Sequence, residues 1–159
     1  MWSCVALPPG EDSFAGRMTS RRNAVIRRYK GKPSKALVEQ LLGEASWLLS
    51  HAEALADYGR QDEARAELLR AASCEEQVAC LLDAADREQE AVVHRVSAAA
   101  CHQQVGQYTR AVTLLRAALS ATLPADYRRS IEQQLVPCLT QVSKELPRSP
   151  AARAASPQA

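Results

Sequence analysis

Aromatic residues and glycines are scarce in this chain of 159 residues. Phe, Trp and Tyr together make up 4% of it, whereas apolar residues make up 47%. A core must therefore be built from Leu, Ala and Val, which favour close helix packing over a large ligand cavity. The chain has 6 glycines, and β-branched residues nowhere sustain an alternation with polar ones. These absences argue against a sheet and predict an all-α protein, and the length predicts a single domain.

Long apolar runs and a paired cysteine framework are also missing. A transmembrane helix needs ~18 or more apolar residues, and no stretch provides them. Residues 1–16 lack the charged start and the long apolar stretch of a signal peptide, and Met18 is an alternative translation start. The five cysteines are an odd number without framework spacing, which favours free thiols in a reducing compartment. We therefore expect a cytoplasmic protein that does not contact a membrane.

The catalytic motifs that we sought are absent: a Gly-rich phosphate loop, His-Glu-x-x-His, Cys-x-x-Cys and Gly-x-Ser-x-Gly. Cys101 and His102 are neighbours, but adjacent residues of a helix point about 100° apart, so we expect Cys101 to be a buried small residue. His94 and His102 alone are a weak metal-ligand set. We expect the clustered acidic residues to be solvated charges: Glu75, Glu76, Asp83, Asp86, Glu88 and Glu90. The sequence predicts no enzyme, no metal and no cofactor.

Charge is distributed unevenly along the chain. Residues 1–35 contain eight Lys or Arg and two acidic residues, a net charge of +6, whereas residues 36–146 contain ten and sixteen, a net charge of −6. We expect residues 1–33 to be a solvated, disordered basic arm and residues 147–159, which contain three prolines, to be a disordered tail. The main cations of the arm are Arg21, Arg22, Arg27, Arg28, Lys30 and Lys32.

The basic arm supports three further hypotheses. Clustered cations gain affinity for nucleic acid or another anionic surface by releasing counterions. The arm is also complementary in charge to the acidic body, so self-association within one chain or between two chains is an alternative. A mitochondrial presequence is the third hypothesis, and Glu11 and Asp12 count against it.

Five helices are predicted between residues 34 and 146 from the three-and-four spacing of apolar residues. Their expected ranges are 35–58, 63–83, 87–105, about 108–121, and a fifth helix that begins near Pro124. Pro137 lies inside the fifth helix and predicts a kink near residues 133–137.

The predicted helix ends have identifiable signals. Gly59 and Gly106 are expected to end two helices, because glycine adopts a positive φ at little cost. Ser34, Asp62 and Asp86 are the expected N-caps. The inner faces are expected to carry Leu37, Leu41, Ala45, Leu48, Ala52 and Leu55, then Leu68, Ala72, Ala79 and Leu82, then Val92, Val96, Ala99 and Gln103, with Val93 and Ala100 beside them, then Ala111, Leu115 and Ala118, and finally Tyr127, Ile131, Leu135, Cys138 and Val142.

Residues 59–72 and 106–119 follow one plan. From the glycine, each places Ala five residues on, Leu nine on and Ala twelve on, and both contain Leu-Leu-Arg-Ala-Ala. Internal repetition of a helix–turn–helix unit is typical of helical arrays, in which each unit buries an apolar face against the next.

The repeated plan resembles a tetratricopeptide repeat (TPR), over roughly residues 36–146. Gly106, Tyr108, Ala111, Leu115 and Ala118 match the family's second helix, and the first copy lacks only the aromatic residue. The copies are 47 residues apart, whereas the family period is 34. We therefore expect the middle helices to be longer by up to about two turns each.

The resemblance implies a short right-handed α–α superhelix of about five antiparallel helices, the fifth acting as a cap. It also implies a non-catalytic protein–protein interaction module, or scaffold, that binds a peptide or helix of a partner protein in its concave groove. Glu53 and Asp57 would favour a basic ligand; the alternative is that the groove residues are simply exposed or packed against the next helix. Matching positions give this groove as Leu49, Glu53, Asp57, Val96, Ala100, Gln103 and Gln104.

Overall fold

The computed structural model describes residues 34–145, and within this range the chain forms helices and no strand. The expected basic arm and the expected tail lie outside the described residues. The all-α prediction is confirmed. The helices are α2 (Lys35–Asp57), α3 (Gln61–Ala84), α4 (Glu88–Gln104), α5 (Tyr108–Leu119) and α6 (Ala125–Glu145).

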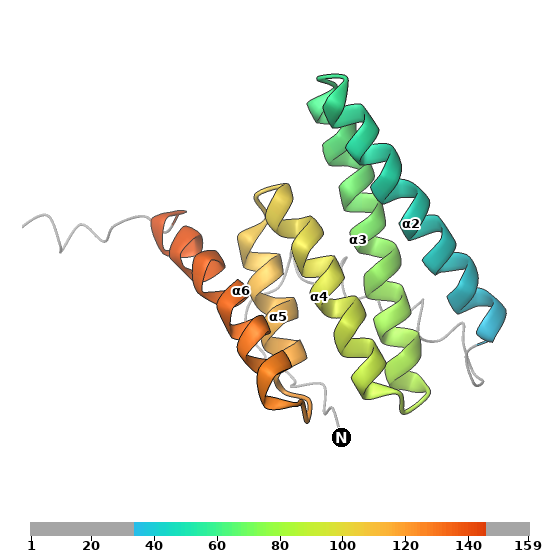
Figure 1. Ribbon diagram of the computed structural model, residues 1–159, viewed down its shortest axis with the longest axis vertical. Coiled ribbons are helices and arrows are strands. Elements are labelled where there is room, and N and C mark those ends of the chain that lie inside the picture. Colours follow the sequence, from blue (N-terminus) through green and yellow to red (C-terminus); the bar gives the residue numbers. More distant parts are fainter. Residues whose placement is uncertain (1–33, 146–159) are drawn as a thin grey trace, which may run out of the picture. The chain divides into compact units, whose positions relative to one another are not determined.

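Each helix packs against the next one along the chain, and successive helices run antiparallel (Figure 1). Helices α2 and α3 form the longest hairpin, with 23 and 24 residues, whereas α5 has 12. The α2–α3 hairpin therefore extends beyond the turn that joins α4 to α5 (Figure 1). Helix α6 continues through Pro137, and both the kink and the right-handed TPR-like superhelix stay predictions.

Three of the four turns between these helices share one hydrogen-bonding pattern. In each, a residue with positive φ donates its N–H to the carbonyl three residues earlier, and the next residue donates to the carbonyl five earlier. This is the Schellman motif, which satisfies the last carbonyls of a helix. The positive-φ residues are Gly59 (φ 75°), Asp86 (φ 58°) and Gly106 (φ 75°).

Two of the predicted N-caps are wrong because of this motif. Asp86 ends α3 as the left-handed residue, a conformation that Asp tolerates better than most residues, and Arg87 takes the N-cap position of α4. Helix α3 begins at Gln61 with Arg60 at the N-cap, so Asp62 lies within the first turn. Ser34 does occupy the N-cap position of α2, although its side chain makes no capping hydrogen bond.

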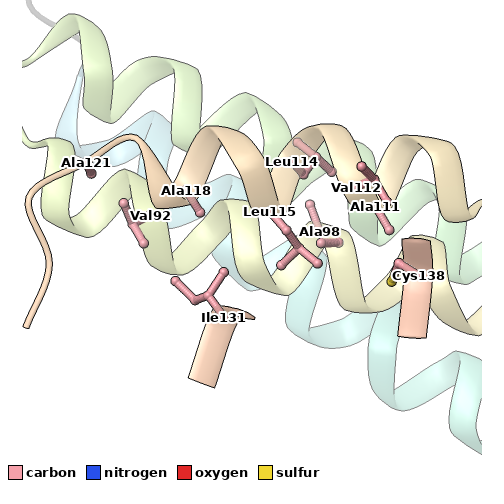
Figure 2. Close-up of a cluster of buried hydrophobic side chains, with 11 residues drawn as sticks. Val92, Ala98, Ala111, Val112, Leu114, Leu115, Ala118, Ala121, Ile131 and Cys138 are labelled. Atoms are coloured by element: carbon pink, nitrogen blue, oxygen red, sulfur yellow. The ribbon is translucent and has the colours of Figure 1, made fainter. Parts of the chain in front are cut away.

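Helix α4 belongs to two apolar groups. On one side, Ala91 and Cys101 pack with buried residues of α2 and α3. On the other side, α4 forms a larger cluster with α5 and α6, in which Leu115 and Ile131 are fully buried (Figure 2). Val93, expected beside the inner face of this helix, is 49% exposed. None of the described helices combines the length and apolar character needed to cross a membrane.

Candidate functional site

A hollow of about 620 Å³ lies where the C-terminal half of α2, the N-terminal half of α3 and the end of α4 meet. The α2–α3 hairpin extends past the turn that joins α4 to α5, so the end of α4 borders this part of both helices (Figure 1). The residues that line the hollow are Leu49, Ala52, Glu53, Ala56, Gln61, Asp62, Ala64, Arg65, Leu68, Gln104 and Val105.

Helical spacing explains how both apolar and charged groups reach the hollow. On α2, Leu49, Glu53 and Ala56 follow one another at four and three residues, beside the buried Ala52. Because alanine side chains are short, they leave depth between the two helices. The floor of the hollow is therefore apolar and its rim is polar.

Three of the seven residues predicted for the partner-binding groove line this hollow, namely Leu49, Glu53 and Gln104. Asp57 is exposed at the last residue of α2, just outside the lining. The cations predicted for the arm lie outside the described residues.

The remaining groove residues of α4 are half-buried and lie away from the hollow. Val96 packs against the cluster formed with α5 and α6. The Gln103 amide donates to α6, with its Nε2 2.8 Å from Cys138 Sγ and 3.4 Å from the Gln134 carbonyl oxygen. Ala100 is half-buried as well.

Sequence reasoning missed the contribution of α3. Gln61, Arg65 and Leu68 line the hollow at helical spacing, together with Asp62 and Ala64. The resemblance assigned the groove to the first helix of each pair, so α3 was not considered. The four-and-three spacing of 61, 65 and 68 is the signal that would have identified this face.

The charged groups around the hollow make no ion pair or side-chain hydrogen bond within residues 34–145. This holds for Glu53, Asp57, Asp62 and Arg65, all of which are exposed. The neighbouring Glu63 differs, because its carboxylate accepts hydrogen bonds from Nε and Nη2 of Arg60 at 2.6 and 2.5 Å. The rim of the hollow thus keeps unpaired charge.

Away from the hollow, Glu76 of α3 joins three helices. Its carboxylate accepts two hydrogen bonds from the Arg110 guanidinium of α5 and lies 3.0 Å from Nε2 of His102 on α4. Nδ1 of His102 lies 2.8 Å from Oε1 of Gln107. Burial alone would raise the pKa of Glu76, but the hydrogen bonds from His102 and Arg110 together lower it to about 2.

Two further pairs join α3 to α4. Nδ1 of His94 lies 2.6 Å from Oε2 of the buried Glu75, and the Arg95 guanidinium donates to Asp83. Burial raises the pKa of Asp83 despite the opposing charge of Arg95. The expectation that Glu75 and Glu76 are solvated is therefore wrong, because both lie against α4 rather than on a polar outer face.

Cys101, the thiol next to His102 in the sequence, lies in the interior of the described helices. Cys101 is buried, as expected, and burial together with the Glu75 charge raises the pKa of its thiol to about 11. Within residues 34–145, no three His, Cys, Asp or Glu side chains are grouped to hold a metal ion.

Comparison of the chain with models of protein families, with curated proteins and with solved structures found no match. The hollow and its charges are therefore the basis for a function.

Proposed function

We propose that this chain is a non-catalytic protein–protein interaction module that binds a peptide or helix of a partner protein in the hollow between α2, α3 and α4. The observation that carries the proposal is an open apolar floor with unpaired charges at its rim. Its volume lies within the range of ligand-binding pockets and accommodates several side chains. The TPR-like character is part of the proposal, and the hairpin turns at Gly59 and Gly106, with equal φ, support it.

The experiment selects peptides from a display library on the full chain and then blocks the hollow. Ala56→Trp places a large side chain in the lining, and we expect it to weaken binding of the selected peptides at least tenfold. Ala66→Trp is the matched control, because Ala66 is an exposed residue of α3 outside the lining. Equal affinities of the two variants, with unchanged unfolding free energies, would refute the proposal.

A second candidate function depends on the basic arm rather than on the hollow. The net charge of +6 over residues 1–35 favours contact with the phosphates of nucleic acid. Binding to arbitrary DNA or RNA that falls steeply with salt, and that is lost when Arg27 and Arg28 become glutamine, would support it. Binding that is insensitive to salt would exclude it.

A further inference from the structure

We infer, on the basis of the proposed function, that the segment bound in the hollow belongs to another protein and is basic and partly apolar. Its arginine or lysine side chains pair with Glu53 and Asp62, while its apolar side chains cover Ala52, Ala56 and Leu68. Charge complementarity at the rim identifies this occupant.

The carboxylates of the α2–α3 hairpin differ in whether an arginine of the same hairpin pairs with them. Outside the lining, Glu44 and Glu67 of the α2–α3 hairpin both form ion pairs with Arg70, at 3.8 and 2.8 Å. At the hollow, Glu53 and Asp62 have no such partner within residues 34–145. Arg60 and Arg70 are thus paired with other carboxylates, whereas Arg65 is unpaired within residues 34–145 and lies in the lining. One arginine cannot neutralise both Glu53 and Asp62, so an external cation is needed to neutralise the rim.

The charged residues in and around the hollow have a negative net charge. Arg65 is the one basic residue among the lining residues, so with Glu53 and Asp62 the lining carries a net charge of −1. Asp57 adds another negative charge beside it. Residues 34–104 contain thirteen acidic and six basic residues, a net charge of −7, whereas residues 105–145 contain three and five, a net of +2. The field around the hollow therefore attracts cations.

The helix ends that border the hollow also carry partial charges. Gln104 and Val105 line the hollow, so the C-terminal end of α4 borders it. The C-terminal end of a helix carries a partial negative charge and stabilises a nearby cation. The N-terminus of α3 at Gln61 also borders the hollow and carries a partial positive charge. Arg65 and this helix end offset only part of the negative charge of Glu53, Asp62 and the end of α4, so an acidic segment would still be disfavoured.

The experiment measures the affinity of the full chain for two synthetic helical probes, one with a leucine face and an arginine face, the other with glutamate in place of arginine. We expect the basic probe to bind more tightly and its affinity to fall with salt. The double variant Glu53→Gln, Asp62→Asn should weaken the basic probe about tenfold, from two exposed ion pairs. The control Glu132→Gln, Glu145→Gln removes the same charge from exposed, unpaired carboxylates of α6 and should change affinity less than twofold.

Each outcome separates this inference from the proposed function. If Ala56→Trp abolishes binding of both probes and the charge variants are equivalent, the hollow binds a partner but the basic occupant is refuted. If Ala56→Trp leaves binding unchanged, the hollow is not the site and both proposals fall. A basic-probe affinity that rises on Arg27→Gln, Arg28→Gln would assign the hollow to the chain's own arm and overturn the inference.

Discussion

Helix α4 packs against α3 on one side and against α5 and α6 on the other, and the two contacts differ in chemistry. The contact with α3 contains the pairs Glu75–His94 and Asp83–Arg95, and Glu76 bound to His102. The contact with α5 and α6 is a cluster of Val, Leu, Ile, Ala and Cys side chains (Figure 2). We call them the polar contact and the apolar contact.

The difference between the two contacts shows how a chain poor in aromatic residues determines the packing of its helices. Apolar burial is non-directional and supplies most of the free energy of folding. Buried charges contribute little net stability, but they penalise any register in which a partner is missing. The apolar contact therefore stabilises the array, whereas we propose that the polar contact fixes how the α2–α3 hairpin sits on α4.

The largest effect is expected in the apolar contact. Leu115 is fully buried at its centre, so Leu115→Ala should lower the free energy of unfolding by about 3 kcal/mol through lost burial and a residual cavity. Urea denaturation measures this change. Val136→Ala is the control, because Val136 is 62% exposed, and should cost less than about 0.5 kcal/mol. Similar values for the two variants would show that the cluster does not stabilise the array.

A smaller effect is expected in the polar contact. Glu76→Gln leaves the Arg110 and His102 side chains without their carboxylate and should cost about 2 kcal/mol at pH 7. The exposed Glu90→Gln, which breaks the pair with Arg87, should cost less than about 1 kcal/mol. If the two substitutions cost the same, the polar contact would be no more than a surface ion pair.

The same residue predicts a pH dependence. Because the folded-state pKa of Glu76 is about 2, below its ordinary value of 4.5, its stabilising contribution is present above pH 4.5. That contribution is lost as the pH falls from about 4.5 to about 2. Wild-type and Glu76→Gln stabilities, measured by denaturation between pH 7 and 2, should therefore converge in this window. A difference that is constant with pH would contradict the lowered pKa.

The turns on the two sides of α4 also differ. The turn from α3 to α4, on the side of the polar contact, has Asp86 at the positive-φ position, whereas the turn from α4 to α5 has Gly106. Gly106→Ala should cost about 1 kcal/mol from its positive φ alone, since an added Cβ meets no atom within 4 Å. Asp86→Gly should be neutral or stabilising by about 0.5 kcal/mol. Thermal unfolding measures both, and a large loss on Asp86→Gly would show that the Asp86 side chain has a role of its own.

The labelling rates of the cysteine thiols test both contacts without a substitution. Cys101 and Cys138 are buried, and burial raises the pKa of each thiol, whereas Cys80 is exposed. Iodoacetamide at pH 8 should therefore label Cys80 much faster than the other two, as followed by mass spectrometry of each site. Labelling in urea should make the three rates similar. Rapid labelling of Cys101 in the folded protein would show that the polar contact opens.

The positions of the helices follow from local sequence. Apolar residues three and four apart predicted all five, and Gly59 and Gly106 predicted two ends, because a positive φ is a property of one residue. Asp86 gave no such signal, since Asp occurs far more often at N-caps than in the left-handed conformation.

The sequence predicted some of the residues that line the hollow. Leu49, Glu53 and Gln104 were predicted from the resemblance by matching positions. Their meeting with Asp62 and Arg65 depends on how far the α2–α3 hairpin extends past α4. That extension depends on which turn of α3 packs against α4, which no local pattern encodes.

The sequence by itself determined that the chain is helical, where its helices lie and that its body is acidic, because spacing, propensity and charge are local quantities. The tertiary structure alone decided which charges are neutralised. Glu76 and Glu53 are similar exposed-looking acids in the sequence, yet one is bound by Arg110 and the other has no partner within residues 34–145. The reason is that an ion pair between helices requires side chains 34 residues apart to meet within about 3 Å, and only packing brings them together.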